Sequence, residues 1–131
     1  MASSIEFKDA VFCDDIREEK SGKHVLVGVY PEAVGFDSLP KTVNLSAFVT
    51  FRGLVEAKFE VKFRCRINDA PLEVHAQGQM ELEHANQENL SQGIVIPCPP
   101  VEIKEDSVLY IEGCVSDEDW IELAGLRVFK K

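Results

Sequence analysis

The sequence lacks the short motifs that mark the common enzyme active sites. It contains no Gly-x-Ser-x-Gly elbow, no His-Glu-x-x-His pair, no phosphate-binding loop and no dinucleotide fingerprint. The three histidines, His24, His75 and His84, are isolated along the chain, although a catalytic triad is defined by geometry and not by sequence order. We predict no catalytic residue, and an unrecognised hydrolase is the third of three functional hypotheses.

Basic residues are also scarce. Lys and Arg together number 14 against 23 Asp and Glu, which gives a formal net charge of −9. Nucleic-acid binding and attraction to anionic membranes both depend on clustered Lys and Arg. We therefore expect neither nucleic acid nor a membrane as partner. The acidity favours solubility, a basic partner or a divalent cation.

Long apolar runs and targeting signals are missing as well. Residues 1–8 have neither the basic nor the apolar region of a secretory signal. No segment approaches the ~20 apolar residues of a membrane-spanning helix. These absences lead us to expect a cytoplasmic protein.

Closely spaced cysteines are absent, although the chain has four of them. Zinc ligands usually come in close pairs, and disulfides are rare in the cytoplasm. We therefore predict free thiols that mostly pack as small apolar side chains, with no cofactor bound through them. The cysteines are Cys13, Cys65, Cys98 and Cys114.

The chain is of ordinary globular composition. Its 131 residues are 45% hydrophobic and 28% charged, and no linker, repeat or low-complexity segment divides them. We predict a single domain spanning residues 1–131.

Alternation of apolar and polar residues with a period of two is the dominant pattern. It is complete in residues 55–67 and again in residues 72–83, with turn-forming residues at 68–71 between them. A hairpin with a four-residue loop would join these strands. Its register would pair Val61 with Gly78, Phe63 with Ala76, Lys58 with Glu81, Ile67 with Leu72, and Arg66 with Glu73.

The remaining strands follow from the same pattern, and helical spacing occurs only near residues 82–90. About eight strands, each with one apolar and one polar face, predict an all-β protein. We expect a single antiparallel two-sheet β-sandwich of immunoglobulin-like or C2-like Greek-key type. The Cys…Trp…Cys arrangement of true immunoglobulin domains is missing. The other predicted strands are residues 5–17, with a bulge near Asp9, and 23–30, 42–51, 94–96, 107–115 and 120–129.

Two segments carry a resemblance. One begins Cys13-Asp14-Asp15-Ile16-Arg17 and continues with Gly22-Lys23 and Leu26-Val27-Gly28-Val29, and the other is Leu109-Tyr110-Ile111-Glu112-Gly113. They resemble an uncharacterised family of small bacterial and phage proteins, over roughly the first thirty residues and loosely near the end. The resemblance implies a β-sandwich of bacterial or phage origin and implies no activity. We assign structural roles to Gly22 and Gly28.

Acidic residues form the most suggestive chemical cluster. Calcium binds six to eight oxygens, often from carboxylates on separate loops. A calcium-dependent, C2-like binding module is therefore our second functional hypothesis. The alternative is a solvated turn at residues 117–119, with Arg17 in a structural role holding a carboxylate at its strand end. The candidate ligands are Asp14, Asp15, Asp117 and Asp119.

An aromatic side chain on a polar strand face suggests an interface. Phe48 lies on the same side as Asn44, Ser46 and Thr50. It either anchors a partner or second subunit, or is covered by the loop 31–40. Our leading hypothesis is a non-enzymatic interaction or accessory module that binds protein, including a second copy of itself. Its candidate surface is Phe36, Phe48, Lys62, Arg64 and Arg66, although the three basic residues also suit cross-strand pairing.

Overall fold

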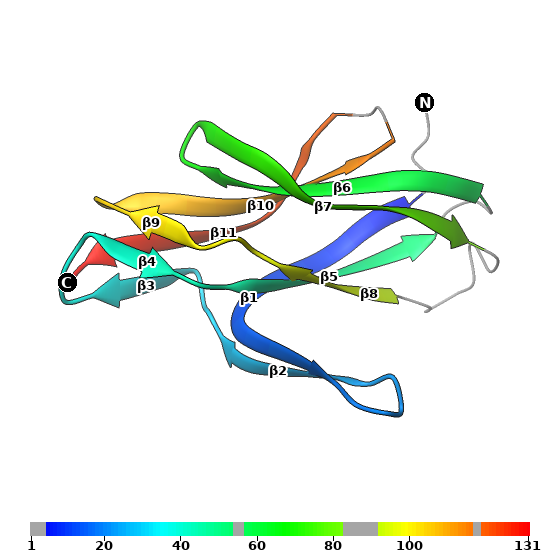
Figure 1. Ribbon diagram of the computed structural model, residues 1–131, viewed down its shortest axis with the longest axis horizontal. Coiled ribbons are helices and arrows are strands. Elements are labelled where there is room, and N and C mark those ends of the chain that lie inside the picture. The colour runs from blue at the N-terminus through cyan, green and yellow to red at the C-terminus, as the bar shows by residue number, and fades with distance from the viewer. Residues whose placement is uncertain (1–4, 54–56, 83–91, 117–118) are drawn as a thin grey trace.

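The protein is a β-sandwich. The computed structural model describes residues 5–53, 57–82, 92–116 and 119–131, and these form eleven strands (Figure 1). The strands are β1 (Ile5–Glu18), β2 (His24–Val29), β3 (Ala33–Phe36), β4 (Lys41–Val43), β5 (Ser46–Gly53), β6 (Ala57–Ile67), β7 (Ala70–Leu82), β8 (Gln92–Pro97), β9 (Val101–Ile103), β10 (Ser107–Val115) and β11 (Ile121–Lys130).

Two sheets enclose the core. One has the strand order β2-β1-β5-β8, the other the order β3-β11-β10-β6-β7, and β4 pairs with β9 in a separate ribbon. The predicted all-β sandwich is confirmed. The described strands outnumber the predicted eight for two reasons. The predicted strand 42–51 is divided into β4 and β5, and the short strands β3 and β9 lie in segments where we predicted no strand. One pairing, β3 with β11, is parallel.

The core follows from the period-two pattern. Ala47, Val49 and Phe51 on β5 are fully buried, as is Ile96 on β8, and they face buried residues of β6, β10 and β11. A strand places alternate side chains on opposite faces. The residues between the buried ones therefore lie on the outer faces of the sandwich, where any surface function must lie.

The β6–β7 hairpin confirms part of the predicted register. Lys58 pairs with Glu81, Val61 with Gly78, and Phe63 with Ala76. Near the turn the prediction is wrong, because Ile67 pairs with Ala70 and not with Leu72. Asn68 adopts a φ of 51°, which closes a tighter turn than the four-residue loop, and irregularities at Arg64 and Arg66 absorb the difference.

Strand β1 belongs to the sandwich only in its first part. Residues 5–13 pair with β5, and the register shifts between Phe7 and Asp9, as the sequence predicted. Residues 14–18 pair only with β2. We call residues 14–29 the hairpin arm; Figure 1 shows β1 curling away from β5 before it pairs with β2. Within the described part of the chain, no helix is long and apolar enough to cross a membrane.

Candidate interaction surface

The predicted acidic cluster is divided among separate contacts. Asp14 accepts a hydrogen bond from the Tyr30 hydroxyl, whereas Asp15 accepts one from Arg17 Nε at 3.2 Å. Asp119 lies two residues before β11 of the other sheet, and Asp117 lies outside the described residues. In the described ranges, no group of three or more His, Cys, Asp or Glu side chains could hold a metal ion. The calcium-dependent module therefore stays a prediction.

The base of the arm is held by Tyr30 more than by Arg17. Arg17 does pair with a carboxylate as predicted, but the two side chains are 73% and 54% exposed, and exposed pairs contribute little stability. The hydrogen bond to Asp14, together with burial, raises the pKa of Tyr30 to about 12. The Tyr30 amide also donates to the Phe12 carbonyl at 2.8 Å, which ties the end of β2 to the sandwich.

The three basic residues of the predicted surface have carboxylate partners. Arg64 Nε lies 2.9 Å from Glu112 Oε1, and Arg66 Nη2 lies 2.8 Å from Glu122 Oε1. Lys62 Nζ lies 3.2 Å from Glu60 Oε1. The stripe therefore offers no unneutralised positive surface to an acidic partner.

Aromatic rings hold the same two arginines in place. The Arg64 guanidinium carbon lies 4.1 Å from the centroid of the Trp120 ring, and that of Arg66 lies 4.1 Å from the Tyr110 centroid. Glu112, which also approaches Arg66 Nε at 3.4 Å, is only 7% exposed. These contacts make a packed network on the outer face of the five-stranded sheet, consistent with a structural role.

Phe48 is half-buried on the outer face of the four-stranded sheet. Its ring centroid lies 5.0 Å from that of His24, at the start of β2. The residue packed against it therefore comes from the hairpin arm and not from the loop 31–40. Phe36 is also half-buried, packs against the core, and has Lys41 Nζ 5.4 Å from its ring centroid.

The predicted surface is divided between the two sides of the sandwich. Phe48 alternates with buried residues of β5, whereas Arg64 and Arg66 alternate with the buried Phe63 and Cys65 of β6. The outer faces of two packed sheets point in opposite directions. One partner surface cannot cover Phe48 and the basic stripe together without wrapping around an edge.

An exposed apolar edge was missed by the sequence analysis. Val25, Val27 and Val29 are 38%, 40% and 51% exposed. They occupy alternate positions of β2, and β2 is an edge strand of its sheet whose neighbour there is β1. We call these three residues the valine edge. The sequence did contain a signal for this exposed edge, because residues 25–29 include no polar residue. An edge strand with such a sequence leaves apolar side chains exposed when nothing packs on one of its faces.

The other edges of the two large sheets are better protected against pairing. β7 carries charged residues, β8 ends in Pro97, and β3 is a half-buried strand of four residues. Short length, charge and proline are the usual devices that prevent another chain from adding to a sheet. β2 contains no charged residue and no proline. Its open side is therefore the most favourable place for another strand.

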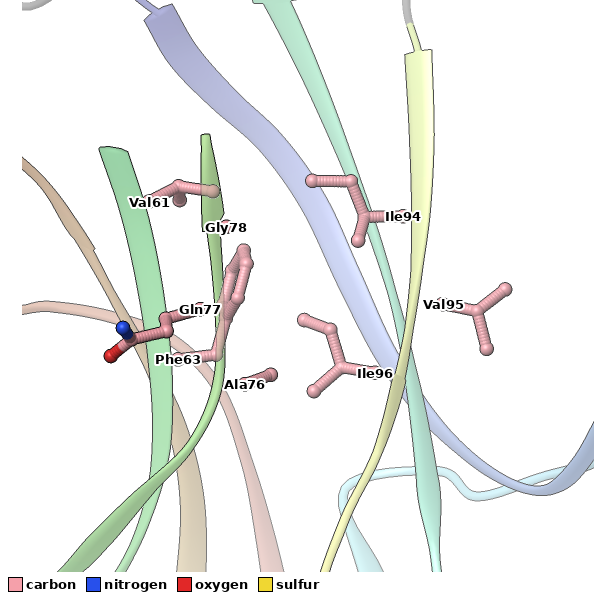
Figure 2. Close-up of a pocket in the computed structure, with 8 residues that line it drawn as sticks. All are labelled: Val61, Phe63, Ala76, Gln77, Gly78, Ile94, Val95 and Ile96. Carbon is pink, nitrogen blue, oxygen red and sulfur yellow. The ribbon is translucent and has the colours of Figure 1, made fainter. Parts of the chain in front are cut away.

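A hollow of about 320 Å³ lies between β7 and β8, on the side where the two sheets do not meet. Figure 2 shows Phe63, Ile94 and Ile96 directed into it, whereas Gln77 and Val95 point away. Ligand pockets usually combine an apolar wall with a few polar groups that orient the ligand. The one polar residue in the lining of this hollow, Gln77, points away from it, so we do not assign the hollow a function.

Comparison with known proteins gives no indication of the function of this chain. The chain matches no protein-family model and no curated protein. The valine edge is therefore the feature on which we base a proposal, because it places three exposed apolar side chains on one edge strand, whereas the edge strand β8 has one, Val95.

Proposed function

We propose that the chain is a non-enzymatic protein-interaction module that takes an extended segment of a partner protein onto the open edge of β2. The exposure of Val25, Val27 and Val29 on this strand carries the proposal. An edge strand presents unpaired N–H and C=O groups, and an added strand satisfies them while its alternate side chains pack on one face.

The chemistry of the arm indicates what kind of segment fits. β2 carries no charge, and the pairing Asp15↔Val27 and Arg17↔Val25 places two opposite charges on the face of the valines. These two charges already pair with each other. A segment with uncharged, β-branched residues at alternate positions therefore fits this face. Covering the exposed part of each valine would contribute roughly 1 kcal/mol, on the scale of 1.5–3 kcal/mol for complete burial.

A displayed library of extended peptides tests the proposal. Peptides selected on the wild-type protein should protect the amides of residues 25–29 from hydrogen exchange. Val27→Lys should abolish their binding, because a charge would then lie on the docking face. The matched control is Ile121→Lys, since Ile121 is 43% exposed on β11 of the other sheet.

The outcome is decisive when both variants melt as the wild type does. Loss of binding in Val27→Lys alone supports the proposal. Equal binding by both variants, or amide protection confined to another strand, overturns it. Running the selection with calcium and with EDTA also tests the second hypothesis, because a calcium-dependent module would bind its peptides only with the metal.

A further inference from the structure

Strand β2 itself has the kind of sequence that its open edge favours. It reads His-Val-Leu-Val-Gly-Val over residues 24–29, with no Asp, Glu, Lys or Arg and with valine at alternate positions. The proposed function calls for an uncharged segment with β-branched residues at alternate positions. A second copy of the chain presents such a segment on a strand that is already extended and exposed. The choice of this partner rests on the proposed function.

The backbone of β2 is oriented for such a pairing. The Glu19 amide donates to the Lys23 carbonyl at 2.8 Å, so these two residues form a hydrogen-bonded pair of the hairpin. Hydrogen-bonded and non-hydrogen-bonded pairs alternate along an antiparallel ladder. Val25 and Val27 continue the register from Lys23 at every second residue, so their backbone groups point toward β1. The N–H and C=O groups of Leu26 therefore point to the open side.

We propose that two copies of the chain associate through β2, which pairs antiparallel with the partner's β2 about a two-fold axis at Leu26. The Leu26 residues of the two copies then exchange two backbone hydrogen bonds, and Val25 of each copy lies opposite Val27 of the other. Cross-strand pairs of β-branched side chains stabilise a sheet. The two four-stranded sheets become one continuous sheet across the axis.

The symmetry and size of the contact define the assembly. A two-fold contact uses the same surface on both copies, and β2 has β1 on its other side, so pairing stops at two. Each copy contributes one strand of six residues. Such a contact covers less surface than the roughly 1,600 Å² of a standard interface, and small interfaces are typical of weak complexes. We therefore expect a dimer that forms and dissociates with protein concentration.

The net charge of the chain predicts how salt affects this dimer. Two copies of a chain with a formal charge of −9 repel each other, and β2 contributes no ion pair that would offset the repulsion. Salt screens the repulsion between exposed charges. Raising the salt concentration should therefore strengthen the dimer, whereas it would weaken the binding of a basic partner.

Sedimentation velocity of the full chain tests the proposal. Between about 1 μM and about 1 mM the wild type should change from monomer to dimer. The change should need less protein in about 1 M salt than in about 0.1 M salt. Val27→Lys should stay monomeric, because lysine on an edge strand opposes pairing. Ile121→Lys adds the same charge on β11 of the other sheet and should dimerise as the wild type does.

Hydrogen exchange of the wild type locates the contact without a substitution. The Leu26 amide should exchange more slowly as the dimer forms. This measurement decides the question even if Val27→Lys fails to fold. A wild type that stays monomeric up to about 1 mM, or a dimer whose amide protection lies on another strand, overturns the proposal.

Cysteine variants test the antiparallel register. A mixture of Val25→Cys and Val27→Cys should form a disulfide-linked dimer in air, because directly opposite residues lie within disulfide distance. Each variant alone should form far less, since its two cysteines would lie diagonally, about 7–8 Å apart. The wild type controls for its four free native thiols, of which only Cys98 is not buried. Equal cross-linking by each variant alone would mean parallel strands and overturns the proposal.

The peptides selected for the proposed function distinguish its failure from the failure of self-pairing. They are tested at a concentration where the chain is monomeric. Peptide protection of residues 25–29 with no dimer at high concentration overturns self-pairing and leaves the proposed function standing. A dimer through β2 with no peptide binding supports self-pairing and overturns the proposed function, because the edge would then accept only its own copy.

Discussion

The Asp14 carboxylate lies over Gly28, in the space that a Cβ atom on residue 28 would occupy. Gly28 has a φ of 67°, which side chains other than glycine adopt only with strain. Asp14 also accepts a hydrogen bond from the Tyr30 hydroxyl. This packing sets the shape of the arm at its base, and the arm in turn presents the valine edge.

We expect Gly28→Ala to lower the free energy of unfolding by about 1–3 kcal/mol. The new methyl group would both clash with the Asp14 side chain and impose strain at a positive φ. Urea unfolding followed by circular dichroism measures the change. The size of the loss also reports how strongly the arm is coupled to the sandwich.

Gly78→Ala is the matched control for that substitution. A Cβ on Gly78 would meet nothing within 4 Å, and the φ of Gly78 lies outside the left-handed region. We expect no loss, or a gain of about 0.4–1 kcal/mol, because alanine restricts the unfolded chain. Equal losses in the two variants would show that glycine content, and not the contact with Asp14, sets the effect.

Removing the Tyr30 hydroxyl should lower the free energy of unfolding at neutral pH, because the base of the arm loses a hydrogen bond. Tyr30→Phe deletes the hydrogen bond to Asp14 and should cost about 0.5–1.5 kcal/mol of unfolding free energy. Asp14 is exposed, so water can replace the lost donor and the cost stays in this range. Thermal and urea unfolding measure the difference, and an unchanged stability would contradict the assigned contact.

The same contact predicts a dependence on alkaline pH. The pKa of Tyr30 is raised from 10.0 to about 12, because its hydroxyl donates to a carboxylate. A group whose folded pKa is raised contributes stability below its unfolded pKa and loses it as pH rises through the folded pKa. Wild type should therefore lose this contribution between pH 10 and 12, and Tyr30→Phe should not. Phenolate absorbance should show one late-titrating tyrosine in the wild type only.

Among the charged residues outside the arm, Glu112 should be the one whose substitution lowers the free energy of unfolding most. It is 7% exposed and approaches both Arg64 and Arg66. Glu112→Gln leaves two partly buried guanidinium groups without a carboxylate between them and should cost about 2–4 kcal/mol. Glu122→Gln is the control, since Glu122 is 54% exposed and should cost less than about 1 kcal/mol. Comparable losses would show that burial does not distinguish the two pairs.

Local alternation predicted most of the sheet structure. The strand at residues 57–67 needed only the period-two pattern, because its buried residues alternate with more exposed ones, whereas β10 alternates only as far as Ile111 and is buried on both faces beyond it. The register near Ile67 was wrong because the turn depends on the conformation of one residue, Asn68, which the pattern does not specify. Short strands such as β3 lack enough residues to show alternation.

The candidate surface depended on contacts between distant residues, which alternation does not reveal. Arg64 finds Glu112 at a separation of 48 residues, and Arg66 finds Glu122 at 56. The predicted pairing of Arg66 with Glu73 across the hairpin is wrong, because Arg66 lies opposite Pro71 and its guanidinium pairs with Glu122 of another strand. The departure of β1 from the sandwich after residue 13 was equally hidden, and with it the open side of β2.

Phe48 should contribute to stability through the arm rather than stand as a free surface anchor. Its ring packs against His24, and a Cβ on Gly93 would overlap the ring. We expect Phe48→Ala to cost about 1–3 kcal/mol and His24→Ala about 0.5–1.5 kcal/mol. A double-mutant cycle separates this contact from other effects, because residues in contact show a coupling energy of about 0.5 kcal/mol or more. Strictly additive losses would mean that the arm does not rest on Phe48, and would return this residue to the partner-binding candidates.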